Sequence, residues 1–354
     1  MAGIIKEASL PSNEQIRAST SAEGNSEEVD EPEEPQELNA TSQLPDPSLQ
    51  QERLAACPHK MAGQHVRDGV IHSRYTVPAA IDNMEDEFVF REDDVLMAAY
   101  PKTGSTWLTM IIHLILNRDE LLRGEISKDV QRLASFMELI LSPGSTECEE
   151  FENSKSPRLM KSHLQYRILQ KTLARTKSKT GAHPYVVIPI RNPKDTMVSY
   201  FHFYRMYEIL GNFEGTWDDF FEMTMNDQIV SGTWFDHLLG WSVLEGHPKV
   251  TFVLYEDTKD DPKKVIRHFA KFFDKEISEL EIDKIVEMTD FQKMKSATRT
   301  NMTKVEGFDN EKSQFLRKGV AGDWKNYFTA EQNKRFDELY KSKMAACTLP
   351  VRFE

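Results

Sequence analysis

The chain has 354 residues, a formal net charge of −13 and 39% hydrophobic residues, a length that suits one large domain or two smaller ones. The acidic balance argues against a general nucleic-acid binder, which needs a basic face, and the longest apolar stretch, residues 107–116, is too short to cross a bilayer. Three cysteines are too few for a disulfide framework, which favours a reducing compartment. Together, these features predict a cytoplasmic protein without nucleic-acid or membrane partners.

The amino-terminal segment differs in composition from the rest of the chain. Residues 1–50 contain eleven acidic and two basic residues, five prolines and no aromatic residue. Such a segment buries too little apolar surface to offset the conformational entropy lost on ordering. We therefore predict an acidic disordered extension over residues 1–60, which serves either as a solvated tail or as a regulatory or partner-binding segment. A single domain is predicted over residues 75–354.

Four short apolar runs are typical of strands buried on both faces of a parallel sheet, and they cover residues 95–100, 158–160, 185–190 and 250–255. Pro189 lies inside the third run, so we expect that strand to end early or to bulge there. Because helical patterns separate these runs, the sequence predicts an α/β fold, a doubly wound parallel sheet flanked by helices.

The helices between the strands carry clear start signals. An apolar helix is predicted over residues 106–116, and Asn192 followed by a proline is a typical helix start. Asp261 precedes another proline and an apolar stripe, while Thr329 and Gln332 have the spacing of a capping box.

The first strand leads into a turn and then into the first helix. This turn holds one glycine, a lysine and several hydroxyl side chains, and it reads Tyr-Pro-Lys-Thr-Gly-Ser-Thr-Trp over residues 100–107. A glycine-containing turn at a helix amino terminus suits a phosphate-like anion, although an ordinary turn with an exposed lysine has the same pattern. The lysine precedes the glycine, so this is not a Walker A motif.

Charged residues follow the other predicted strands as well. A lysine and a histidine end the second strand, an arginine follows the third, and a pair of bases lies near the carboxyl terminus. Each of these has an ordinary alternative, such as a core histidine or a solvated basic turn. Together, five cations near loop ends in an acidic chain indicate a ligand with several negative groups: Lys102, Lys161, Arg191, Arg317 and Lys318.

Four motifs in this order resemble the cytosolic sulfotransferases, and the resemblance runs from about residue 75 to the carboxyl terminus. Residues 100–107 resemble the loop that holds the 5′-phosphosulfate, and residues 191–204 resemble the family's 3′-phosphate segment. Residues 161–163 are similar to the segment with the catalytic histidine, and residues 317–326 to the carboxyl-terminal signature.

The resemblance implies a P-loop-like enzyme that transfers the sulfuryl group of 3′-phosphoadenosine 5′-phosphosulfate (PAPS) to a hydroxyl or amine of a small apolar acceptor, without a metal. It makes His163 the general base, helped by Lys102, Lys161 and Ser199. The donor-binding residues that it implies are Lys102, Thr103, Gly104, Ser105, Thr106, Trp107, Arg191, Ser199, Tyr255, Thr289, Phe291, Arg317, Lys318 and Gly319.

The chain departs from the family pattern in three places, of which the first is the acidic amino-terminal extension, which has no counterpart in the family core. Ser162 and Gln165 replace a threonine and a proline beside the histidine, so the acceptor loop has its own shape. Ala330 and Lys334 replace a valine and a glutamate in the dimer segment, which predicts a monomer or a weak homodimer. Two alternatives stay open at this point, another P-loop transferase such as a nucleotide kinase, or a non-catalytic nucleotide-binding protein.

Overall fold

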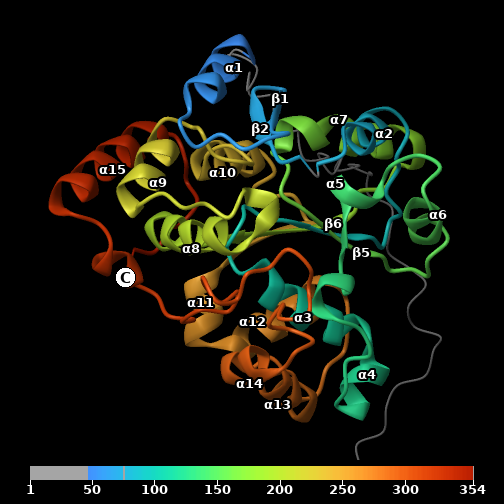
Figure 1. Ribbon diagram of the computed structural model, residues 1–354. Coiled ribbons are helices and arrows are strands. Elements are labelled where there is room, and N and C mark those ends of the chain that lie inside the picture. Colours follow the sequence, from blue (N-terminus) through green and yellow to red (C-terminus); the bar gives the residue numbers. More distant parts are fainter. Residues whose placement is uncertain (1–46, 75, 354) are drawn as a thin grey trace, which may run out of the picture. The chain divides into compact units, whose positions relative to one another are not determined.

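The computed structural model describes residues 47–74 and 76–353, which belong to one compact unit. A five-stranded, all-parallel sheet lies at its centre (Figure 1). From one edge to the other, its strands are β4 (Ser135–Phe136), β5 (Leu159–Ser162), β3 (Val95–Ala98), β6 (Tyr185–Ile190) and β7 (Val250–Leu254). The predicted fold class is confirmed.

Helices cover both faces of this sheet because its strands alternate their side chains between two apolar cores. Val95 and Met97 face one core, Leu96 and Ala98 the other. The first core is closed by α3 (Ser105–Leu116), α12 (Pro262–Phe272) and α13 (Glu279–Met288). The second is closed by α2 (Pro78–Asp86), α7 (Tyr166–Thr180) and α10 (Trp234–Ser242), and Figure 1 shows the two groups of helices on opposite sides of the sheet.

A third, aromatic-rich core lies among α8 (Pro193–Met206), α9 (Trp217–Met225), α10 and α15 (Ala330–Lys343). The remaining elements complete the described part of the chain. They are α1 (Pro47–Ala56), β1 (His65–Arg67), β2 (Val70–His72), α4 (Arg118–Arg123), η2 (Val130–Arg132), α5 (Met137–Ile140), α6 (Thr146–Glu152), η3 (Glu208–Leu210), α11 (Tyr255–Asp260), α14 (Phe291–Ser296) and η4 (Asp323–Asn326).

The predicted helix starts agree with the structure. The Asn192 side chain accepts hydrogen bonds from the first turn of α8, and Asp261 caps α12 in the same way. Thr329 and Gln332 form a complete capping box at α15. The four predicted strands are present; β6 has the predicted bounds, and the ends of the other three differ by at most two residues. The two-residue strand β4 and the β1–β2 hairpin have no apolar run long enough to be predicted.

The expectation that Pro189 ends or bulges its strand is wrong, because β6 continues through it and pairs in register with Val253. The N–H of Tyr185 is directed toward β3 and that of Val186 toward β7. By alternation, the nitrogen of Pro189 lies on the β3 side, where pairing with β3 has already ended at Val187. The missing N–H therefore costs no sheet hydrogen bond.

Part of the predicted extension is folded. Residues 1–46 lie outside the described residues, so the prediction for them stays a prediction. Residues 47–60, in contrast, include α1, which packs Leu54 into the third core. Gln50 is fully buried and its side-chain amide donates to the backbone carbonyl of Asp227 at 2.5 Å. The predicted boundary at residue 60 therefore lies inside the folded part of the chain, which includes α1.

We expect removal of residues 1–46 to leave the melting temperature unchanged, because their composition provides little apolar surface to bury. Removal of residues 1–57 should lower it, because the burial of Leu54 and Cys57 is lost, at a cost on the order of 3 kcal/mol. Calorimetric melting of the two truncated proteins beside the full chain checks this. Equal melting temperatures for both truncations would contradict the docking of α1.

Candidate active site

A cavity of about 1380 Å³ opens at the carboxyl ends of the central strands. The central strand β3 has β5 on one side and β6 on the other, so the strand order changes direction at this point of the sheet. Open α/β sheets bind ligands at such a switch point. All but one of the residues predicted for the site line this cavity: Lys102, Gly104, Ser105, Thr106, Trp107, Lys161, His163, Arg191, Ser199, Tyr255, Thr289, Phe291, Arg317, Lys318 and Gly319. The exception is Thr103.

Two glycines let aromatic side chains approach the backbone of the site. Gly104 has a φ of +98°, and a Cβ there would lie 2.6 Å from the ring of Tyr255. Gly319 has a φ of +66°, and a Cβ there would lie 2.5 Å from the ring of Phe291. Any larger residue would be strained and would push the ring away. These contacts bring together segments more than 25 residues apart in the sequence.

The turn before α3 presents backbone donors. No side chain caps the amino terminus of α3, so its first N–H groups and the positive end of its dipole remain available for an anion. Thr103 does not reach the cavity. It is fully buried, and its hydroxyl donates to the carbonyl of Tyr100 at 2.8 Å, which holds the turn in shape.

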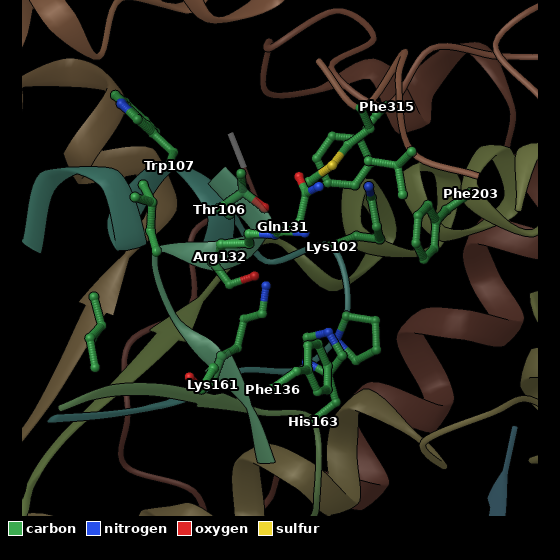
Figure 2. A pocket seen from close by; sticks show the side chains of 18 of the residues that line it. Lys102, Thr106, Trp107, Gln131, Arg132, Phe136, Lys161, His163, Phe203 and Phe315 are labelled. Carbon is green, nitrogen blue, oxygen red and sulfur yellow. The ribbon is translucent and has the colours of Figure 1, made fainter. Parts of the chain in front are cut away.

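Lys102 lies at the centre of the cavity with its ammonium between two aromatic rings. Its Nζ is 4.3 Å from the ring centroid of Phe203 and 4.2 Å from that of Phe315. Figure 2 shows the Lys102 side chain between these two aromatic residues. Burial and the nearby positive charges of Arg191, Lys161 and Arg317 lower the pKa of Lys102 to about 7. An anion in the cavity would reverse the charge effect, so this site favours a negatively charged ligand.

His163 follows β5 directly and lines the same cavity as Lys102. Its Nδ1 lies 2.5 Å from the carbonyl oxygen of Ala99. A carbonyl only accepts, so Nδ1 carries the proton and Nε2 keeps a free lone pair. Burial and the charges of Lys161 and Lys102 lower the pKa of His163 to about 3. The ordinary pKa near 6.5 that its residue type suggests is therefore not found, because the imidazole is buried beside two lysine side chains.

Glu138 holds the histidine segment, and the sequence did not point to it. Its Oε1 accepts a hydrogen bond from the backbone N–H of His163 at 2.5 Å, while its Oε2 has no partner among the described residues. Burial raises the pKa of Glu138 to about 7. The one available signal was a lone acid inside the apolar run of residues 136–141.

The cations predicted for a second anionic group also gather. Arg191 donates from Nη1 to the carbonyl of Lys102 at 2.9 Å, and its Nε has no partner among the described residues. Arg317 and Lys318 both bind the Asp323 carboxylate, at 2.5 and 2.6 Å. Burial opposes ionisation of that carboxyl, but the hydrogen bonds hold the pKa of Asp323 at about 2. Asp323 thus anchors two cations without neutralising both.

Asp195 links the two cation-bearing segments. Its carboxylate accepts hydrogen bonds from the backbone N–H groups of Gly322 and Trp324, at 2.6 and 2.9 Å. The first turn of α8 is thereby fixed to the loop that carries Arg317. Ser199 lies further along α8 and faces the cavity.

Comparison with known proteins decides the family. A family model described as "Sulfotransferase domain" matches residues 92–348. Sulfotransferase 1C2 of Homo sapiens is 37% identical over 295 residues, which are 81% of this chain and 96% of that protein. The chain belongs to the sulfotransferase family. The predicted family and enzyme class are confirmed. Sulfotransferase 1B1 of Canis lupus familiaris is similar as well, at 36% identity over 79% of this chain and 93% of its own.

Solved structures show the same relationship. Mouse sulfotransferase SULT7A1, complexed with PAP, is 30% identical with a TM-score of 0.64, over 80% of this sulfotransferase and 96% of that chain. Retinol dehydratase in a complex with retinol and PAP has a TM-score of 0.72 at 21% identity, over 88% and 98% of the two chains, and shows the shared fold. In the described part of this sulfotransferase, no helix is long and apolar enough to span a membrane. Nor do three or more His, Cys, Asp or Glu side chains gather there as a metal site.

Proposed function

We propose that this sulfotransferase transfers the sulfuryl group of PAPS to a hydroxyl or amine of a small apolar acceptor. The observation that carries the proposal is a single cavity lined by three cations, Lys102, Arg191 and Arg317. The uncapped amino terminus of α3 and the neutral imidazole of His163 line the same cavity. PAP, 3′-phosphoadenosine 5′-phosphate, is the product that PAPS leaves behind, and its presence in the structure of a 30% identical relative supports this donor.

The residues divide by the part of the donor that they suit. The turn of residues 102–106 and the amino terminus of α3 suit the 5′-phosphosulfate, because they offer an ammonium, hydroxyls and free N–H groups. Trp107 and Tyr255 meet edge to face with centroids 5.9 Å apart, and with Thr289 and Phe291 they form a wall for the adenine. Arg191, Ser199 and residues 317–319 hold the 3′-phosphate.

Catalysis rests on a proton acceptor and on positive charge. Nε2 of His163 accepts the proton of the acceptor hydroxyl as its oxygen attacks sulfur, and the bond from sulfur to the 5′-phosphate oxygen breaks. Lys102 and Lys161 stabilise the negative charge that develops on the transferring and leaving oxygens. Burial lowers the pKa of Lys161 to about 8, so an anion is needed to keep it fully charged.

Apolar rings shape the acceptor side of the cavity. Phe136 lies edge to face with His163, with centroids 4.9 Å apart. Phe308 and Tyr207, whose ring centroids are 4.1 Å apart, line the same cavity. Transfer of labelled sulfate from PAPS to a panel of phenols, sterols, alcohols and amines tests the proposal. Tight PAP binding without transfer to any of them would favour a non-catalytic nucleotide-binding protein, and transfer of phosphate from a nucleoside triphosphate would favour a kinase.

We expect PAP binding at pH 8 to take up protons from solution. Lys102 has a pKa of about 7 without ligand and is largely uncharged at pH 8, whereas a bound phosphate raises its pKa and protonates it. At pH 6 the lysine is already charged, so its uptake should vanish. Calorimetry in two buffers of different ionisation enthalpy measures this. An uptake at pH 8 that is unchanged in Lys102→Ala would contradict the assignment.

We also propose that the enzyme is cytoplasmic and is a monomer or a weak homodimer. Ala330 and Lys334 are exposed at the start of α15, where they offer neither the apolar contact nor the acid of the family's dimer segment. A symmetric interface would repeat each loss in both copies. Sedimentation should therefore show a monomer at micromolar concentration. A dimer that persists on dilution would contradict this.

A further inference from the structure

The amino-terminal hairpin forms one wall of the cavity. Val70 and His72 of β2 line the cavity, whereas Ile71 between them is fully buried in the third core. Successive residues of a strand point to opposite sides, so Val70 and His72 share the side that faces the cavity. The N–H of Ser231 donates to the carbonyl of Ile71 at 2.9 Å and fixes this wall to the neighbouring loop.

His72 brings an unpaired polar atom to this wall. The residue is 3% exposed, and its Nε2 has no hydrogen-bond partner among the described residues. The hydroxyls of Ser73 and Thr76, which also line the cavity, bond to each other at 3.2 Å. Buried polar atoms are nearly always paired, so a partner for Nε2 is expected from outside the described residues.

The protonation state and tautomer of the His72 imidazole define which kind of group this partner must be. The ring makes a hydrogen bond to the backbone of Arg67, and since Nε2 has no partner, the bond comes from Nδ1. Burial lowers the pKa of His72 to about 3, and electrostatic interaction with His65, Arg67 and Arg167 lowers it further. A neutral imidazole that donates through Nδ1 offers Nε2 as an acceptor.

We propose that Nε2 of His72 accepts a hydrogen bond from a second hydroxyl or N–H group of the acceptor. The preferred acceptors of this enzyme then carry two hydrogen-bond donors, one that is sulfated beside His163 and one that is held by His72. This inference rests on the proposed function. An ether or carbonyl oxygen at the second position cannot donate, so such an acceptor leaves Nε2 unpaired and binds less well.

Matched phenols test the inference. The probes are hydroquinone, 4,4′-dihydroxybiphenyl and 4,4′-dihydroxystilbene, which differ in length, each beside its monomethyl ether. We expect the wild type to prefer the diphenol of the fitting length over its ether by about three- to tenfold in kcat/KM, beyond the factor of two for its two equivalent hydroxyls. His72→Leu should lose this preference and His72→Gln, which keeps an acceptor oxygen, should retain part of it.

Val70→Ala is the matched control, because it changes the same wall without changing its polarity. It should alter kcat/KM for a diphenol and its ether by the same factor. Binding of each probe to the PAP-saturated enzyme, measured by calorimetry, separates recognition from chemistry. A diphenol preference in binding that is lost in His72→Leu supports the inference even where no sulfate is transferred, an outcome that overturns the proposed function alone.

A different pair of results overturns the inference alone. If sulfate is transferred but the ratio of kcat/KM for diphenol and ether is the same in wild type and His72→Leu at all three lengths, His72 does not bind a second hydrogen-bond donor of the acceptor. The same conclusion follows if calorimetry shows no difference between each diphenol and its ether. Sulfuryl transfer itself would stand in both cases.

Discussion

His163→Ala should lower the single-turnover rate of sulfuryl transfer by about 100- to 10,000-fold, the range for removal of a general base. The structure leaves Nε2 of His163 free while Nδ1 is held by Ala99, so alanine removes the only proton acceptor that this residue offers. PAP affinity should stay close to that of wild type, because no donor-binding contact is assigned to the imidazole. Rapid-quench measurement of labelled sulfate on a phenol, with enzyme saturated by PAPS, gives the rate.

Lys102→Ala is the comparison variant for this experiment. It should weaken PAP binding and slow transfer together, because the proposed mechanism has the ammonium of Lys102 contact the donor before and during the reaction. If folded His163→Ala transfers sulfate within about threefold of the wild-type rate, well short of the general-base range, another group accepts the proton. A melting temperature that falls with full activity per folded molecule would show that His163 is a packing residue.

Arg191→Ala should weaken PAP binding far more than adenosine 5′-phosphate binding. Loss of charge-assisted hydrogen bonds costs roughly 1.5–3 kcal/mol, which is about ten- to 150-fold in Kd. The unpaired Nε of Arg191 shows that its guanidinium retains hydrogen-bonding capacity for a ligand. Calorimetric Kd values for the two nucleotides, in wild type and variant, supply the ratio.

The structure adds a smaller effect on the shared 5′-phosphate. Because Nη1 of Arg191 also holds the carbonyl of Lys102, the variant loosens that turn and should weaken both nucleotides slightly. Arg191→Lys keeps the charge but loses the planar fork, so it should recover only part of the PAP selectivity. An equal loss for both nucleotides in Arg191→Ala would remove Arg191 from the 3′-phosphate site.

The sequence predicted the residues at the strand ends because their signals are local. Buried parallel strands read as continuous apolar runs, and helix starts at Asn192 and Thr329 depend on side chains within three residues of the backbone that they cap. The carboxyl ends of parallel strands share one edge of the sheet, so residues that follow β3, β5 and β6 meet wherever they lie in the chain.

The tertiary structure decided what depends on distant contacts. Glu138 lies 25 residues before the His163 backbone that it holds, and α1 depends on a carbonyl 177 residues away from Gln50. The pKa values of Lys102, about 7, and His163, about 3, follow from burial and from charges on other loops. Composition and order along the chain therefore determined the fold class, the family motifs and the residues at the strand ends. The protonation states, the anchors behind the catalytic groups and the His72 wall depend on desolvation and long-range packing, which exist only once the chain is folded.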